Sequence, residues 1–256
     1  MTETRVKTDD LAASGVRLLT LSRPEKKNAF DVTQAEQLWA AIEAADADDA
    51  VRVIAVTAEG DYFTGGADIT IFRDFASLDP DSVKQVAGLY EPLRACTKPT
   101  VAILQGHCVG MGVTMLPSFD LVYAADHVTF TTPFVKIGLV QEYGSSHTLP
   151  RLIGLQRAKE LLLRATPLDA QTAADWGLVT RLFPAATLRE EALKIATELA
   201  GNPPGAVAQA KRLLDVGVMA SFDEACRAED DVLATRYGSP ENVAAVTAIL
   251  SRKKKA

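Results

Sequence analysis

Apolar residues recur along the first half of the chain in two patterns, which predict alternating strands and helices. Short apolar runs rich in β-branched residues have the length of strands, and they occupy residues 15–22, 51–57, 100–105, 120–124 and 128–131. Between the first two runs, apolar side chains repeat at helical spacing, and Asp31 followed by Gln34 resembles a capping box. We therefore predict a helix that runs to about Ala47. Strands that alternate with helices favour an α/β fold.

The pattern changes at about residue 145, beyond which apolar residues recur almost entirely with the helical period. The predicted helices occupy residues 156–164, 169–176, 188–199, 204–216, 222–237 and 240–252, and only 178–183 interrupts them as a strand. An earlier helix is predicted to begin at Asp79-Pro80 and to end before Lys98-Pro99. We expect an α/β core over residues 1–195 and a helical C-terminal region over residues 196–256.

Composition and charge narrow the classes of partner. The chain of 256 residues is 48% hydrophobic, which is ample for a packed core, and no apolar run reaches the roughly 18 residues of a membrane span. Its net charge of −6 argues against nonspecific binding to nucleic acid or to an anionic membrane. An anionic small molecule would need a local basic patch, for which Arg23, Lys26 and Lys27 are candidates.

The cysteines and histidines do not point to a metal site. Three cysteines are odd in number and scattered, and the histidines lack metal-ligand spacing, so we predict neither a disulfide framework nor a bound metal. Cys108 stands beside His107, which leaves a thiol nucleophile open as an alternative, although adjacent residues need not face each other.

Two glycine-rich turns are the strongest candidates for a site. The stretches 64–68 (TGGAD) and 106–112 (GHCVGMG) each follow a strand-like run and open a helix-like one. Glycine lets the backbone approach a ligand closely, and a helix start leaves N–H groups without internal partners. One N–H from each turn would make an oxyanion hole, where losing one donor costs about 2.7–4 kcal/mol. The alternative is a pair of ordinary turns that serve strand-to-helix packing.

Other glycine motifs fit poorly. Met115 stands where a dinucleotide fingerprint would need its third glycine, and the sequence has no G-x-S-x-G elbow, phosphate loop or H-E-x-x-H pattern.

Three segments in register carry a family resemblance. Residues 21–30 (LSRPEKKNAF), 63–69 (FTGGADI) and 98–120 together resemble the enoyl-CoA hydratase/isomerase (crotonase) superfamily, over nearly the whole chain. The resemblance implies a crotonase (ClpP/crotonase-like) α/β spiral of ββα units. It also implies that the helical C-terminal region mediates homotrimers, often paired into hexamers.

The resemblance assigns roles residue by residue. The backbone amides of Ala67 and Met111 match the two oxyanion-hole donors that hold the thioester oxygen of an acyl-CoA substrate. Met111 stands where hydratases usually have glycine. The substrate-binding positions implied are Lys26, Lys27 and Ala29 along the CoA moiety, Asp68 and Ile69 near the adenine, and also Gly66 and Phe134.

Departures from the family pattern suggest the reaction. Hydratases of the family use two glutamates to activate water, and this chain has Thr114 and Phe134 at those positions. Glu142 is the carboxylate that remains, and it aligns with the single catalytic glutamate of the Δ3,Δ2-enoyl-CoA isomerase branch. The resemblance thus implies that Glu142 moves a proton from C2 to C4 of a 3-enoyl-CoA, with no cofactor beyond the coenzyme A of the substrate. Taken alone, Glu142 would be a solvated loop residue.

Two other functions stay open at this stage. One is an enoyl-CoA hydratase or another crotonase-type acyl-CoA lyase with its base elsewhere, and the other is a non-catalytic CoA-binding protein. The pocket shape would depend on Phe72, Phe75 and their neighbours. A polar, acidic start and a C-terminus that reads KKKA, unlike a peroxisomal import signal, lead us to expect a cytoplasmic protein.

Overall fold

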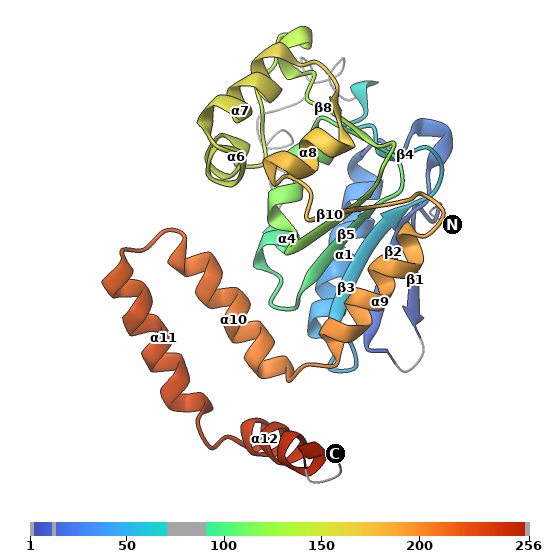
Figure 1. The fold of residues 1–256 in the computed structure, drawn as a ribbon. Coiled ribbons are helices and arrows are strands. Elements are labelled where there is room, and N and C mark those ends of the chain that lie inside the picture. Colours follow the sequence, from blue (N-terminus) through green and yellow to red (C-terminus); the bar gives the residue numbers. More distant parts are fainter. Residues whose placement is uncertain (1–2, 12–13, 71–90, 254–256) are drawn as a thin grey trace.

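The computed structural model describes residues 3–11, 14–70 and 91–253 (Figure 1). Within them, a six-stranded sheet has the order β1-β2-β3-β5-β7-β10. Its strands are β1 (Val6–Leu11), β2 (Val16–Leu21), β3 (Val53–Ala58), β5 (Thr100–Leu104), β7 (Leu121–Ala125) and β10 (Arg181–Phe183). Only β1 and β2 pair antiparallel in this described sheet. Because every residue of β3 and β5 is buried, the centre of this sheet is covered on both faces.

A smaller sheet carries the two glycine turns. In the described residues its order is β4-β6-β8-β9, with β4 (Tyr62–Thr64), β6 (His107–Val109), β8 (Thr129–Thr131) and β9 (Leu168–Asp169). β4 runs parallel to β6, so the segments that follow these two strands leave the sheet at the same edge. Gly65 and Gly66 follow β4. Strand β6 lies within the second glycine-rich stretch, and Gly110 and Gly112 follow it, so the two turns lie side by side.

Helices cover both faces of the large sheet. Helix α1 (Val32–Ala47) packs on β1, β2 and β3, and α9 (Leu188–Ala200) packs on the opposite face (Figure 1). The first turn of α1 is capped by the Asp31 side chain, which accepts from the Gln34 N–H at 2.9 Å. The reciprocal bond of a capping box is absent, because Gln34 Oε1 accepts no hydrogen bond; the side-chain NH2 of Gln34 donates to the Asn28 carbonyl at 3.0 Å. The helix therefore has one half of a capping box.

Apart from α1, the described helices between β2 and β10 are short. They are η1 (Pro24–Lys26), α4 (Glu91–Ala95), α5 (Met111–Thr114), η3 (Leu116–Ser118), η4 (Phe134–Ile137), α6 (Ser145–Ile153), α7 (Leu155–Lys159), the π-helix η5 (Glu160–Arg164) and α8 (Ala170–Trp176). The predicted helix over 156–164 is thus split into α7 and η5. The predicted helix start at Asp79-Pro80, as well as Phe72 and Phe75, lies outside the described residues.

The last three helices extend away from both sheets. They are α10 (Pro204–Gly217), α11 (Phe222–Arg236) and α12 (Pro240–Lys253), drawn in orange and red in Figure 1. No residue of α10 or α11 is buried, and large apolar side chains such as Leu214 (71% exposed) and Phe222 (82%) face solvent. A helix with an apolar face needs something to cover it. The division of the chain at residue 195 stays a prediction.

Strand β1 was missed by the sequence patterns. Its sequence, VKTDDL, buries only Val6 and partly buries Leu11, because it is an edge strand. Its formation depends on a full antiparallel register with β2, which pairs Val6 with Leu21 and Leu11 with Val16. Hydrophobic periodicity alone could not predict that pairing.

Candidate active site

The two glycine turns are packed directly against each other. A Cβ added at Gly66 would lie 2.7 Å from the Val109 carbonyl oxygen and 3.5 Å from the Gly110 Cα. Gly66 also has a φ of +86°, where other residues are strained. A Cβ at Gly112 would lie 2.4 Å from Thr64 Cγ2. These glycines allow an approach that any side chain would prevent.

A short parallel bridge directs the amide of Ala67 away from Phe30. Ala67 pairs with Phe30: the Phe30 N–H donates to the Gly66 carbonyl at 2.7 Å, and the Asp68 N–H donates to the Phe30 carbonyl at 2.8 Å. In such a bridge the central residue directs its own N–H away from its partner. The Ala67 N–H therefore points away from Phe30.

The amide of Met111 is available for a different reason. Met111 is the first residue of α5, and the first N–H groups of a helix lack internal acceptors. Gly110 precedes it with a φ of +54°, and its own N–H is used by the Thr131 carbonyl at 2.8 Å. The predicted pair of amides, Ala67 and Met111, thus follows two glycines in close contact. This geometry is compatible with both amides serving one oxygen atom.

Buried polar groups fix the shape of the first turn. The Thr64 hydroxyl donates to the Asn28 carbonyl at 2.8 Å and accepts from the Gly66 N–H at 3.0 Å. The buried Asn28 amide donates to the Glu59 and Tyr62 carbonyls, each at 2.8 Å. Sequence reasoning missed both roles. Asn28, a non-glycine residue with a φ of 50°, could have been found only by knowing its backbone conformation.

Glu142 is held close to the second turn. The buried Thr114 hydroxyl, on α5, donates to Glu142 Oε1 at 2.7 Å, and Glu142 Oε2 is also buried. Ser145 fixes the loop, since its N–H and hydroxyl donate to the Glu142 carbonyl at 3.1 and 2.7 Å. The carboxylate is therefore not the freely solvated loop group of the alternative interpretation. Sequence reasoning had noted Thr114 only as a replacement for a glutamate.

Phe134 lies beside the second glycine turn. It lies on η4, is 9% exposed, and its ring atom Cζ would lie 3.8 Å from a Cβ built on Gly110. Its aromatic ring therefore stands beside the turn that presents the Met111 amide.

The residues predicted along the CoA moiety occupy the rim of the first turn. Lys26 and Lys27 are exposed, and the Lys27 carbonyl accepts from the Gly65 N–H at 2.7 Å. The Lys27 ammonium lies 4.9 Å from the centre of the Tyr62 ring, in cation–π contact. Ala29 is half-buried, and Ile69 is 68% exposed.

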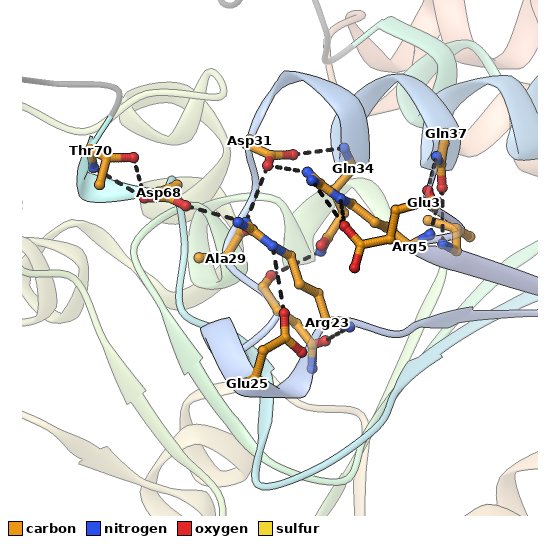
Figure 2. Close-up of polar contacts among 12 residues, drawn as sticks. Glu3, Arg5, Arg23, Glu25, Ala29, Asp31, Gln34, Gln37, Asp68 and Thr70 are labelled. Atoms are coloured by element: carbon orange, nitrogen blue, oxygen red, sulfur yellow. Dashed lines mark hydrogen bonds and ion pairs between the residues drawn. The ribbon is translucent and has the colours of Figure 1, made fainter. Parts of the chain in front are cut away.

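Arg23 does not belong to this exposed basic group. Its side chain is 12% exposed and points inward, toward Asp31 at 3.3 Å and Asp68 at 3.2 Å (Figure 2). The basic patch inferred from the sequence is therefore reduced to Lys26 and Lys27.

The structure disfavours a thiol nucleophile. Cys108 is fully buried, and burial raises the pKa of its thiol far above neutrality. The neighbouring His107 ring lies 3.2 Å from the Thr129 backbone nitrogen through Nδ1. In residues 3–11, 14–70 and 91–253, no three His, Cys, Asp or Glu side chains are grouped as a metal site. Nor does this part of the chain contain a helix long and apolar enough to cross a membrane.

Known proteins are similar to this chain in sequence and in fold. Residues 12–253 match the sequence profile of the Enoyl-CoA hydratase/isomerase family. The chain is 34% identical over 249 residues to Enoyl-CoA delta isomerase 2 of Homo sapiens, and the aligned region covers 94% of this chain and 62% of that protein. The chain thus spans about 62% of the length of this relative. It is also 34% identical over 232 residues to Mevalonyl-coenzyme A hydratase sidH of Aspergillus fumigatus, covering 89% of this chain and 85% of that one.

The fold of a solved structure matches nearly the whole chain. A protein from Mycobacterium abscessus of the enoyl-CoA hydratase/isomerase type superposes with a TM-score of 0.89 at 32% identity, covering 96% of each chain. The expected crotonase fold, a mixed α/β core followed by several helices, is therefore confirmed.

Proposed function

The chain belongs to the enoyl-CoA hydratase/isomerase family, and on that premise we propose that it converts 3-enoyl-CoA to conjugated 2-enoyl-CoA. The observation that carries the proposal is the hydrogen bond from Thr114 to Glu142. Thr114 and Met111 lie on the same helical turn, so this bond ties the carboxylate to the element that presents one of the two amides. Enolisation of a thioester requires a base that removes the proton and hydrogen-bond donors that stabilise the oxygen anion, and a carboxylate with two backbone amides can supply both.

The reaction follows from these groups. Glu142 takes a proton from C2 of the 3-enoyl thioester, and the C–H electron pair moves into the conjugated system. The resulting dienolate oxygen accepts hydrogen bonds from the Ala67 and Met111 amides. The protonated Glu142 then returns the proton to C4, and the double bond moves from C3–C4 to C2–C3. Substrate and product are isomers.

No other reactant is needed for this chemistry. One proton moves within the substrate and no electrons are gained or lost overall. We therefore propose that the substrate is an acyl-CoA thioester and that the coenzyme A it carries is the only coenzyme involved. Lys26 and Lys27, exposed beside the first turn, supply positive charge for its phosphates.

Hydration is the second candidate, because one relative named above is a hydratase. Adding water across a double bond requires groups that position water and transfer its proton. Thr114 is fully buried and bonded to Glu142, and Phe134 places an aromatic ring at the second turn. Neither side chain can act as a base, so isomerisation is the better supported of the two reactions.

We also propose that α10, α11 and α12 bind further copies of the chain in a homotrimer or a hexamer. A groove of about 800 Å³ lies between these helices, and its lining includes Leu213, Leu214, Val218, Val232 and Leu233. The exposed apolar side chains of the same helices supply the surface that association would bury.

The function is tested by measuring two reactions with the same protein preparation. Isomerisation is followed as conjugated thioester absorbance formed from 3-enoyl-CoA, and hydration as loss of that absorbance from 2-enoyl-CoA. Rapid isomerisation with negligible hydration is the expected result. Hydration as fast as isomerisation would favour the second candidate.

A further inference from the structure

One ion-pair cluster includes Asp68, the last residue of the first glycine turn (Figure 2). It contains Arg23, Asp31 and Asp68, whose side chains are 12%, 23% and 15% exposed. Arg5 joins it through an ion pair with Asp31. The resemblance placed Asp68 near the adenine of CoA, and Arg23 was expected to contribute to an exposed basic patch, so the sequence assigned a positioning role to neither side chain.

The cluster contacts both segments of the bridge that orients Ala67. Arg23 Nη1 donates to the Ala29 carbonyl at 3.1 Å, in the segment that contains Phe30. The same nitrogen donates to Asp68 Oδ2 at 3.2 Å, in the segment that contains Ala67. Arg23 therefore ties the residue before Phe30 to the residue after Ala67. Two backbone hydrogen bonds and this guanidinium fix the direction of the Ala67 N–H together.

The carboxylates are held from their other sides as well. Asp68 Oδ1 accepts from the Thr70 N–H at 3.1 Å and from its hydroxyl at 2.7 Å. Asp31 caps α1 through the Gln34 N–H. Although burial favours the neutral acid, the hydrogen bonds from Thr70 and Arg23 hold the pKa of Asp68 below its usual range. The ion pair is therefore formed at neutral pH.

We propose that Arg23 is a positioning residue, which fixes the Ala67 amide in the oxyanion hole through Asp68 and the Ala29 carbonyl and does not bind the phosphates of the substrate. This inference rests on the proposed function. Its physical basis is that an oxyanion hole acts by donors held at one place before the charge develops. A displacement of about 1 Å at such a site can cost about 100-fold in rate.

Arg23→Met and Asp68→Asn test the proposal. Each removes the ion pair, and we expect each to lower kcat by about 10-fold or more with little change in KM. Arg23→Lys keeps the charge but carries it on a different side chain with a single nitrogen at its tip, so its kcat should lie between those of Arg23→Met and the wild type. The double variant should be hardly worse than Arg23→Met, because that substitution already removes the contact with Asp68 as well as the one with the Ala29 carbonyl.

Arg17 supplies a matched control. Its side chain is 13% exposed and pairs with two carboxylates, Asp10 at 2.6 Å and Asp48 at 2.8 Å, but it contacts neither glycine turn. Arg17→Met should lower the unfolding temperature about as much as Arg23→Met and leave kcat near the wild-type value. If Arg17→Met lowers kcat equally, Arg23 matters only for general stability and the proposal is wrong.

A truncated substrate separates positioning from phosphate binding. The 3-enoyl thioester of N-acetylcysteamine lacks the phosphates and adenosine of CoA. A positioning residue predicts the same fold loss of kcat on the CoA thioester and on the truncated thioester. A loss confined to KM for the CoA thioester would show that Arg23 binds phosphate and would overturn the inference.

A spectroscopic measurement distinguishes this inference from the proposed function. The infrared carbonyl stretch of bound 2-enoyl-CoA reports how strongly the two amides polarise the thioester, whether or not the enzyme turns it over. We expect a smaller shift from the free thioester in Arg23→Met than in the wild type. If the wild type polarises the carbonyl but isomerises nothing, the proposed reaction fails and the inference survives. If the shift is the same in both proteins, the inference fails whatever the activity.

Discussion

The Thr114 hydroxyl donates a hydrogen bond of 2.7 Å to Glu142 Oε1, across 28 residues of sequence. Thr114 lies three residues after Met111 on α5, so one short helix carries both a proposed oxyanion-hole amide and the hydroxyl that binds the proposed base. The Glu142 side chain is thereby tied to the helix that begins with Met111.

Removal of this hydroxyl should weaken catalysis. Thr114→Val keeps the shape but leaves Glu142 Oε1 without its donor. A hydrogen bond to a charged group contributes about 1.5–3 kcal/mol, so we expect kcat for isomerisation to fall about 10- to 100-fold with a smaller change in KM. Thr114→Ser keeps the hydroxyl and should retain most of the activity. Equal activity of Thr114→Val and the wild type would contradict this role.

The contact between the two turns predicts a rescue. Gly112→Ala places a methyl group 2.4 Å from Thr64 Cγ2, which should separate the turns and cost about 1–3 kcal/mol in stability, with a loss of kcat. Thr64→Ser removes Cγ2 and keeps the hydroxyl that fixes the turn.

Steady-state kinetics and thermal unfolding of both single variants and the double variant measure this effect. We expect the double variant to regain most of the kcat lost in Gly112→Ala, with Thr64→Ser alone close to the wild type. A double variant no better than Gly112→Ala would show that the loss has another origin.

The ion pairs behind the first turn predict a pH dependence of stability. Burial opposes ionisation, but hydrogen bonds and the nearby arginines hold the pKa of Asp31 and of Asp68 below the usual range in the folded protein. Each carboxylate therefore stabilises the fold at pH values above its unfolded pKa of about 3.9, and this contribution is lost as the pH falls through the lower folded pKa. Asp68→Asn should thus lose less unfolding free energy than the wild type between pH 5 and about pH 3. Urea unfolding at both pH values measures the difference, and parallel losses would contradict the role given to Asp68.

The exposed helices predict assembly. Leu214→Glu puts a charge on the apolar groove between α10 and α11 and should lower the mass measured by light scattering from three or six copies toward the 27.4 kDa of one chain. Thr197→Glu adds the same charge on the exposed surface of α9 and should leave the mass unchanged. A wild type that is monomeric at micromolar concentration would contradict the proposed assembly.

Local signals in the sequence were enough for the regular elements. The predicted end of the first helix at Ala47 coincides with the end of α1, because cap, period and terminus all lie within 17 consecutive residues. The strands at β3 and β5 were found because continuous burial leaves a continuous apolar run. Edge strand β1 was missed, since its pairing with β2 places few apolar side chains on it.

The candidate site was predicted only in part, for the same reason. The glycine turns are visible in the sequence, and the family resemblance assigned the amides of Ala67 and Met111 to them before the contact between Gly66 and Gly110 was known. The bond between Thr114 and Glu142 and the inward orientation of Arg23 depend on which distant segments the fold brings together. From its residue type, Arg23 was expected to be a surface cation, whereas in the structure it is half-buried and paired with Asp31 and Asp68.

The central claim is that Glu142 carries the proton, and one comparison tests it most directly. Glu142→Gln keeps the shape of the side chain but cannot accept a proton, so the rate of conjugated thioester formation from 3-enoyl-CoA should fall at least about 1000-fold. Binding of 2-enoyl-CoA should stay within a few-fold of the wild type, because the Ala67 and Met111 amides remain. An active Glu142→Gln enzyme would contradict the account, and the base would then have to be sought elsewhere.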